Sequence, residues 1–159
     1  MAQAARALPA DLAEFLQSGV SILVGTRDSE LRPATARAMG ASVDCERRAL
    51  TVYLPEATAE RTIANPRDNG RIAMTFSRAL DHRSIQIKGT CTLIRAAVEA
   101  ERAVQERYRE LFIDTLAFIG LPRSELERAA YWPSFAVEVA VGELYEQTPG
   151  PQAGSPLSS

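Results

Sequence analysis

The sequence predicts a mainly β fold of the α+β class, in which six antiparallel strands form a barrel flanked by helices. Three observations support this fold class. The length of 159 residues suits one domain. Several segments alternate apolar with polar residues, as half-buried strands do. Most consecutive strands follow one another without an intervening helix, which favours an antiparallel barrel over a doubly wound sheet.

The predicted strands cover residues 20–26, 33–43, 50–54, 72–76, 84–94 and 135–145. The first is a continuous apolar run, which predicts burial on both faces. The second has a small residue at every other position from Ala34 to Gly40. The fifth alternates most clearly and places Ile85, Cys91 and Leu93 on its apolar side.

The predicted helices cover residues 8–16, 56–64, 98–119 and 123–131. Pro9 suits the first position of a helix. We expect the second helix to end at Asn65-Pro66, because the residue before a proline is pushed out of the helical region. The third repeats apolar residues at helical spacing from Val104 to Ile119. Residues 1–147 therefore form the predicted domain, and the Pro-, Gly- and Ser-rich residues 148–159 form an irregular tail.

The composition excludes several functional classes. With 18 basic and 20 acidic residues, the chain has no bulk attraction to nucleic acid or to an anionic membrane surface. The single histidine, His82, argues against a metal site built from His and Cys clusters, and no GxSxG elbow indicates a hydrolase. No apolar run has the length of a membrane span, and no signal peptide is evident. Cys45 and Cys91 are expected to be reduced thiols, so the cytoplasm is the expected compartment.

The order and spacing of several short segments carry a family resemblance. These segments are Phe15-Leu-x-x-Gly19, Pro33-x-x-x-Arg37, Leu50-Thr-Val-Tyr53, Ala64-Asn65-Pro66, Arg71-Ile-Ala-Met-Thr-Phe76 and Arg83-Ser-Ile-Gln-Ile-Lys-Gly89. Together they resemble the pyridoxamine 5′-phosphate oxidase-like FMN-binding split barrels over about half of the chain. The resemblance implies a six-stranded split barrel and a homodimer that holds FMN in a cleft between its two subunits. It also implies two-electron transfer through the flavin, with a substrate or redox partner that the sequence does not identify.

The resemblance also implies a set of cofactor-binding residues. Arg37 matches the family arginine that contacts FMN, and an arginine fork suits phosphate or flavin oxygens. The backbone of Ala38, Met39 and Gly40 would then face the flavin ring. The alternative is that the small residues of this strand only allow close packing, and the strand pattern alone favours it. Tyr53 matches an aromatic position of the family, with ordinary strand packing as its alternative role.

The phosphate-binding run of the family is altered in this chain. Where many members have Ser-Arg-Lys, the aligned residues are Glu56, Ala57 and Thr58. The phosphate would have to use the helix N-terminus and the Thr58 hydroxyl, with Arg61 about one turn further on. The arginine and histidine pattern that holds the substrate of the true oxidase is also missing after Tyr131, so that oxidase activity itself is not expected.

The strand that begins at residue 84 contributes further candidates. Ser84 stands where many members have glutamine, and Ser84, Gln86 and Lys88 form its polar face. These side chains would bind FMN or the partner chain, or they would form a solvent-facing side of the sheet. Arg83 is expected either to bind an anionic ligand or to be an ordinary solvent-exposed arginine. His82 is interpreted as a solvated turn residue rather than as a proton donor or haem ligand.

Three functional hypotheses follow from these residues. The first is an FMN-dependent oxidoreductase of unknown substrate. The second is a non-catalytic protein that binds flavin, F420 or haem, and the altered phosphate run favours it over the first on that point. The third is a dimeric scaffold without a ligand. No catalytic residue is identified, and no metal is expected.

Overall fold

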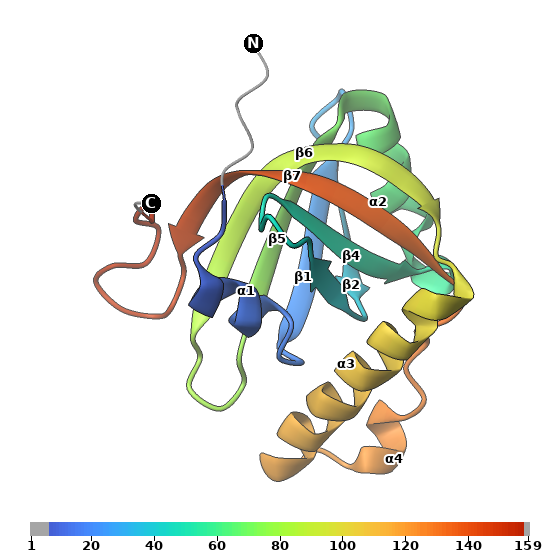
Figure 1. The fold of residues 1–159 in the computed structure, drawn as a ribbon, viewed down its shortest axis with the longest axis vertical. Helices are drawn as coiled ribbons and strands as arrows, with labels where there is room; N and C mark the ends of the chain where they lie inside the picture. Colours follow the sequence, from blue (N-terminus) through green and yellow to red (C-terminus); the bar gives the residue numbers. More distant parts are fainter. Residues whose placement is uncertain (1–6, 158–159) are drawn as a thin grey trace.

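Seven antiparallel strands form one curled sheet in the order β2-β1-β5-β6-β7-β4-β3 (Figure 1). The computed structural model describes residues 7–157; residues 1–6 of the predicted domain and 158–159 of the predicted tail lie outside this range. The strands are β1 (Ser21–Arg27), β2 (Pro33–Ala38), β3 (Ala41–Val43), β4 (Ala49–Pro55), β5 (Arg71–Ser77), β6 (Ser84–Ala96) and β7 (Ser134–Glu146). The helices are α1 (Ala10–Leu16), α2 (Glu56–Asn69), α3 (Glu99–Phe118) and α4 (Arg123–Leu126).

The predicted split barrel is confirmed, with seven strands rather than six. The predicted strand 33–43 is divided at Met39-Gly40, where Gly40 has a φ of 141°. This bend moves the chain from the β1 side of the sheet to the β4 side. Met39 N–H donates to the Tyr53 carbonyl over 2.8 Å, and Tyr53 N–H donates to the Gly40 carbonyl over 3.0 Å. The two edge strands of the sheet are therefore consecutive in the chain, and they bring its edges together.

The core lies inside the barrel, where alternate residues of the strands meet. Its most completely buried apolar side chains include Ile22, Val24, Ala38, Leu50, Val52, Met74, Phe76, Ile87, Val137 and Val139. The prediction that the first strand is buried on both faces is wrong, because Leu23 points outward and is 48% exposed. Leu93 was expected on the apolar side of its strand, but a register shift between Cys91 and Leu93 leaves it 46% exposed.

Helix α2 is longer than predicted, because it continues through Pro66 to Asn69 and ends at Gly70 with a φ of 68°. Proline at position 66 cannot donate a hydrogen bond to the carbonyl of Thr62, four residues earlier. The Thr26 hydroxyl donates to that carbonyl instead, over 3.2 Å. This contact from β1 satisfies the group that Pro66 leaves without a helical donor. The predicted helix 123–131 is shorter than expected and comprises only Arg123–Leu126.

Helix α3 lies on the outside of the barrel, with α4 beside it (lower right in Figure 1). Its Tyr108 hydroxyl donates to the Val20 carbonyl over 2.5 Å, and the buried Gln105 accepts a hydrogen bond from Ser134 over 2.8 Å. Two glycines allow this close approach. A Cβ on Gly19 would lie 2.4 Å from the Leu111 Cβ, and one on Gly40 would lie 3.3 Å from the Gln105 Cγ.

The segment that follows β7 turns back along it (left in Figure 1). Glu146 N–H donates to the Ser155 carbonyl over 2.9 Å, and Leu157 N–H donates to the Leu144 carbonyl over 2.9 Å. Strand β4 pairs with β7 only as far as Ala140. The returning segment therefore supplies backbone partners to the end of β7 that β4 does not reach.

Candidate functional site

Several predicted site residues share the outward-facing side of strands β2, β1, β5, β6 and β7, which is called the outer face here. The strand register aligns Arg37 with Leu23, Leu23 with Thr75, and Thr75 with Gln86. Neighbouring residues such as Ala38 and Phe76 point into the core, so this row points outward. The fold therefore places Arg37 and Gln86 in one row, with two strands between them.

The adjacent row of the outer face consists of three serines. Ser21 aligns with Ser77, and Ser77 aligns with Ser84. Arg37 donates to the Ser21 hydroxyl over 2.6 Å, and the hydroxyls of Ser77 and Ser84 are 2.8 Å apart. No ion pair involves Arg37 among residues 7–157. Ser84 is buried and its hydroxyl donates to the His82 carbonyl over 2.9 Å, so the groups of this surface that can donate to anionic or carbonyl oxygens are the Arg37 fork and the Ser21 hydroxyl.

Two aromatic rings and the returning C-terminal segment border this surface. The Arg37 guanidinium lies 5.7 Å from the centre of the Phe112 ring on α3. Arg83 lies 4.5 Å from the centre of the Phe15 ring on α1. The Ser84 N–H donates to the Thr148 hydroxyl over 3.0 Å, which connects the serine row to the C-terminal segment. These contacts restrict the Arg37 and Arg83 side chains and the start of β6.

The hairpin between β5 and β6 carries Arg83 and His82, together with a further arginine, Arg78. Arg78 forms a two-point ion pair with Asp81, which lowers the pKa of that carboxyl to about 2. Arg83 is 3.9 Å from an Asp11 carboxylate oxygen. His82 adopts a φ of 61° and is exposed, and its N–H closes the turn by donating to the Arg78 carbonyl. Arg78 is therefore neutralised by its own loop, whereas Arg83 has only a long ionic contact.

Helix α3 covers the other part of the predicted site. The side chains of Ala38 and Met39 are in the core, and the Met39 N–H and Gly40 carbonyl are both paired with Tyr53. The Tyr53 hydroxyl is 3.2 Å from Ser42 and donates to Glu101 of α3 over 3.3 Å. Burial raises the pKa of Tyr53 above its usual value. The backbone groups of Met39 and Gly40 and the Tyr53 hydroxyl therefore already have hydrogen-bond partners within the chain.

Thr58 is exposed in the first turn of α2 and forms no side-chain hydrogen bond with another described residue. Glu56 beside it is also exposed, and its N–H is taken by the Pro133 carbonyl over 3.0 Å. The side chain of Pro55, the residue before the helix, provides no cap. No side-chain hydrogen bond among residues 7–157 joins Thr58 to the row of Arg37.

Lys88 lies apart from the serine row, in a broad hollow at the other end of the outer face. The hollow has a volume of about 760 Å³. Its lining includes Gly25, Arg27, Asn69, Arg71, Ala73, Lys88, Thr90, Ala140, Gly142 and Glu143. The Lys88 ammonium lies 4.8 Å from the centre of the Tyr145 ring. Sequence analysis missed Arg27 and Arg71, although both occupy outward positions in the alternation of their strands.

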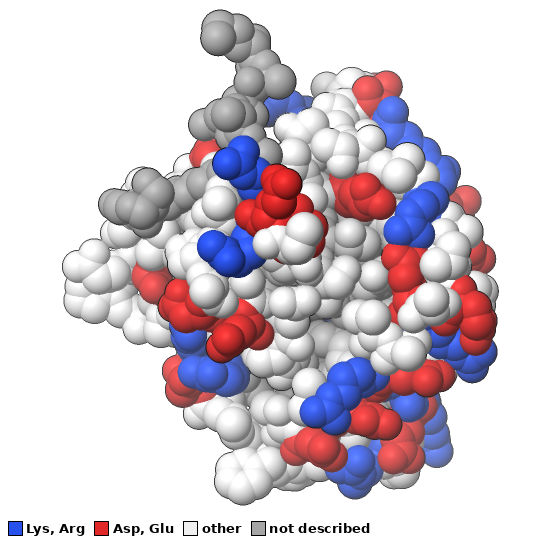
Figure 2. All heavy atoms as spheres, viewed as in Figure 1, with Lys and Arg blue, Asp and Glu red and all other residues white. Residues whose placement is uncertain are grey.

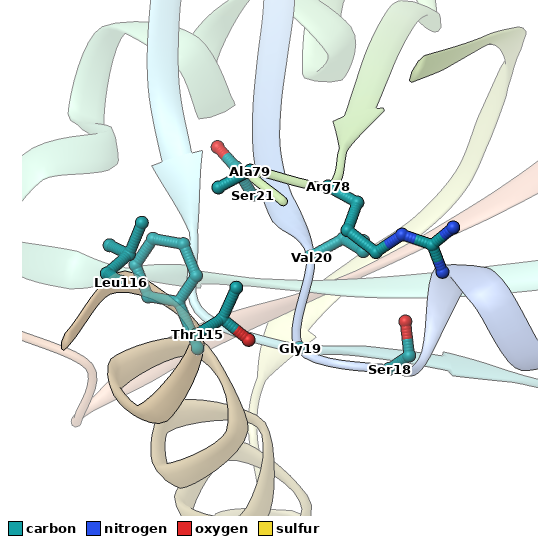
Figure 3. Close-up of a pocket in the computed structure, with 9 residues that line it drawn as sticks. Ser18, Gly19, Val20, Ser21, Arg78, Ala79, Thr115 and Leu116 are labelled. Carbon is teal, nitrogen blue, oxygen red and sulfur yellow. The ribbon is translucent and has the colours of Figure 1, made fainter. Parts of the chain in front are cut away.

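A second, much smaller crevice lies between α3 and the segment that leads into β1. Figure 3 shows Thr115 and Leu116 of α3 on one side and Ser18, Gly19 and Val20 on the other, with Arg78 at its edge. Its volume of about 20 Å³ is enough for a water molecule but not for a cofactor.

Charges of both signs alternate over α3. Figure 2 shows blue and red side chains interspersed on this part of the molecule. Arg102 is paired with Glu106 over 3.1 Å and with Glu99 over 3.6 Å. Within residues 7–157, no group of three or more His, Cys, Asp or Glu side chains is placed to hold a metal ion. None of the helices in that range is both long and apolar enough to span a membrane.

Comparison with known proteins identifies the fold. No protein-family model and no curated protein sequence matches the chain. A putative pyridoxamine 5′-phosphate oxidase from Lactobacillus delbrueckii aligns at 12% identity over 91% of this chain and 99% of its own, with a TM-score of 0.55. An F420 reductase aligns at 14% identity over 86% and 98%, with a TM-score of 0.56. An FMN-binding protein from Syntrophomonas wolfei aligns at 11% identity over 94% and 88%, with a TM-score of 0.51. The chain has the fold of these proteins.

Proposed function

We propose that this protein, which has the split-barrel fold of pyridoxamine 5′-phosphate oxidase-like proteins, binds a flavin-type cofactor on its outer face and acts as a flavin-dependent oxidoreductase. The observation that carries the proposal is the contact of Arg37 with Ser21, which the strand register aligns with Ser77 and, through it, with Ser84. FMN is the first choice of cofactor, since similar structures include an FMN-binding protein. F420 is the alternative, because an F420 reductase shares the fold.

The residues of the outer face fit such a cofactor chemically. Arg37 supplies a planar fork for phosphate or flavin oxygens, and the Ser21 hydroxyl and the Gln86 amide supply further hydrogen-bonding groups. The exposed Leu23 side chain lies between Arg37 and Thr75 in the same row and offers an apolar contact for a ring. A bound flavin would supply two-electron transfer, and the protein would contribute orientation and electrostatics.

We further propose that the protein works as a homodimer in the cytoplasm. The dimer rests on the family resemblance, which implies a cofactor cleft between two subunits. The free thiols of Cys45 and Cys91 agree with a reducing compartment. A single species of monomer mass by light scattering at micromolar concentration would argue against the dimer.

The visible absorption spectrum of freshly purified protein, before and after addition of FMN or F420, tests the proposal. We expect one of these cofactors to stay with the protein through gel filtration. Arg37→Ala should weaken its binding roughly 10- to 100-fold, because a charge-assisted hydrogen bond is lost. Arg37→Lys should restore only part of the affinity, since lysine lacks the fork. Arg128→Ala, at an exposed arginine after α4, is the matched control.

Two results would contradict the proposal. If neither cofactor stays bound, the protein is not a flavin-type binder. If a cofactor binds wild type and Arg37→Ala with equal affinity, the binding site is not at Arg37 and the serine row. Bleaching of a bound flavin by a reduced substrate would separate an oxidoreductase from a non-catalytic binding protein. A Soret band in place of flavin bands would favour the haem alternative.

A further inference from the structure

The hollow at the far end of the outer face brings three cations together. Arg71 aligns with Thr90 and Ala73 with Lys88 between β5 and β6, so Arg71 and Lys88 are diagonal neighbours on one face. Gly25 aligns with Ala73 at the end of the β1–β5 pairing, and beyond it the Asn69 amide joins the backbone of Arg27 to that of Arg71. All three cationic side chains line the hollow, against the single carboxylate of Glu143.

None of these three cations forms an ion pair with a carboxylate within residues 7–157. Arg27 donates to the backbone carbonyl of Asp28, whose carboxylate is held by Arg32 over 2.8 Å. Glu143 lies opposite Lys88 in the strand register, but its carboxylate accepts a hydrogen bond from the Tyr145 hydroxyl and forms no ion pair with Lys88. Like charges on neighbouring strands repel, so this arrangement costs stability unless an anion lies between them.

Asn69, at the end of α2, fixes the two arginines in place. Its side-chain N–H donates to the Arg27 carbonyl over 2.7 Å, and its side-chain oxygen accepts from the Arg71 N–H over 2.9 Å. One amide thus joins the end of β1 to the start of β5. The neighbouring cations are therefore held on backbone positions that are set before any ligand arrives.

The floor of the hollow is formed by small residues. Gly25, Ala73, Ala140 and Gly142 bring the surface close to the backbone, so that a flat or compact group can approach it. The volume of about 760 Å³ lies within the range of small-molecule sites. A floor of small residues with cationic side chains around it can accommodate a phosphate group and the molecule that carries it.

We propose that this hollow is a phosphate-binding site in which Arg27, Arg71 and Lys88 hold the anion and Asn69 positions the arginines. The phosphate belongs either to FMN itself or to a second phosphorylated molecule. In the first case the inference rests on the proposed flavin function, and the hollow replaces the arginine and lysine that are missing at the start of α2. In the second case the site is independent of the flavin.

Isothermal titration of the full chain with pyrophosphate tests the site without any flavin. We expect wild type and the control Arg128→Gln to bind alike, and the double variant Arg71→Gln/Lys88→Gln to bind at least about tenfold more weakly. Affinity should also fall as sodium chloride is raised. Asn69→Ala should weaken binding although it removes no charge. Absence of pyrophosphate binding at 10 mM, on the order of the weakest useful affinities, or equal binding by the double variant, would overturn the site.

Thermal unfolding provides a second readout that also checks that the variants fold. Pyrophosphate should raise the Tm of wild type by several degrees and leave the Tm of the double variant unchanged. Without ligand, the double variant should have a Tm close to that of wild type, because the removed repulsion between cations offsets the lost contact of Lys88 with Tyr145. A double variant stabilised by pyrophosphate as much as wild type would count against the proposal.

Comparison of FMN with riboflavin identifies the source of the phosphate. If FMN binds more tightly than riboflavin and the double variant loses this preference, the hollow holds the flavin phosphate. If both flavins bind equally while pyrophosphate binding persists, the phosphate comes from a second molecule. Loss of all flavin binding with retained pyrophosphate binding would contradict the proposed function but support this site.

Discussion

Ser134 donates a hydrogen bond of 2.8 Å to Gln105, and both side chains are buried where α3 crosses the start of β7. Gln105 also donates to the Glu101 carbonyl of its own helix over 3.4 Å. A buried amide is costly unless its groups are paired, and this one is paired on both sides. The contact therefore fixes the position of α3 on the barrel as well as contributing to stability.

Replacing Gln105 by leucine should destabilise the protein. Gln105→Leu leaves the Ser134 hydroxyl buried without a partner, at a cost of about 1–3 kcal/mol. Chemical denaturation with urea measures the change in the free energy of unfolding. The variant Gln105→Leu/Ser134→Ala should lose less than the sum of the two single variants, because both partners are then absent. If the losses of unfolding free energy of the two single variants were simply additive, Gln105 and Ser134 would not be coupled as described.

Adding a methyl group at Gly19 should disturb the packing of α3 against the barrel. Gly19→Ala places a Cβ 2.4 Å from the Leu111 Cβ at a φ of 79°, so strain and overlap combine to cost roughly 2–4 kcal/mol. Gly120→Ala is the matched control, since its φ is 100° and no atom lies within 4 Å of the added group. Thermal unfolding should show a clearly larger fall in Tm for Gly19→Ala. Equal falls would mean that backbone strain alone matters.

The contact between Thr26 and the helix carbonyl of Thr62 should depend on Pro66. Thr26→Val removes the donor to that carbonyl and the acceptor of the Asn65 amide, and should cost about 1–3 kcal/mol. Pro66→Ala should stabilise this variant, because an alanine N–H can donate to the Thr62 carbonyl within the helix.

The coupling between these two substitutions is measured by a double-mutant cycle with urea unfolding. Pro66→Ala should stabilise the Thr26→Val background more than it stabilises wild type. Thr35→Val, at an exposed threonine of β2, controls for the loss of a hydroxyl. An equal effect of Pro66→Ala in both backgrounds would contradict the assigned role of Thr26.

Glu101 should make the fold sensitive to acid. Two hydrogen bonds from Arg95, over 2.8 and 2.7 Å, are the main cause that lowers the pKa of Glu101 below its usual 4.5. A carboxyl whose pKa is lower in the folded chain contributes stability above the unfolded pKa and loses it as the pH falls through the folded value. The Tm of wild type should therefore fall below about pH 4.5.

A titration of Tm from pH 7 to pH 3 checks this expectation. Glu101→Gln should be less stable than wild type at pH 7, and the difference should shrink as the pH falls. Glu110→Gln, on the exposed side of α3, is the control for the loss of one carboxylate. A constant difference between wild type and Glu101→Gln over the whole range would refute the assignment.

The alternation of apolar and polar residues predicted the main strands, because burial inside the barrel follows the same period of two. It failed where a feature outside the segment decides the structure. In the predicted strand 33–43, Gly40 continues a series of small residues at every other position. The alternation therefore does not distinguish a bend at Gly40 from a continuous strand. Pro66 suggested a helix end, but a threonine 40 positions earlier supplies the missing donor. The exposure of Leu93 likewise depends on another segment, because the register shift after Cys91 belongs to the pairing of β6 with β7.

The site was harder to predict than the fold, since it depends on which strands are neighbours. Arg37 and Gln86 are far apart in the sequence, and only the register of four strands places them in one row. The same register separates Lys88 from them and groups it with Arg71. Tyr53 could be located on its strand, but its cover by α3 depends on contacts such as Glu101 that no local pattern reveals.

The returning segment Gly154–Leu157 has a consequence for solubility. It pairs with residues 144–146 of β7, which would otherwise present open backbone donors and acceptors at the place where β4 has ended. An open strand edge is a template for other chains. A chain shortened after Gln147 would keep its barrel strands and the outer face, yet it would expose such an edge, so self-association through intermolecular strand pairing is the failure to expect from it.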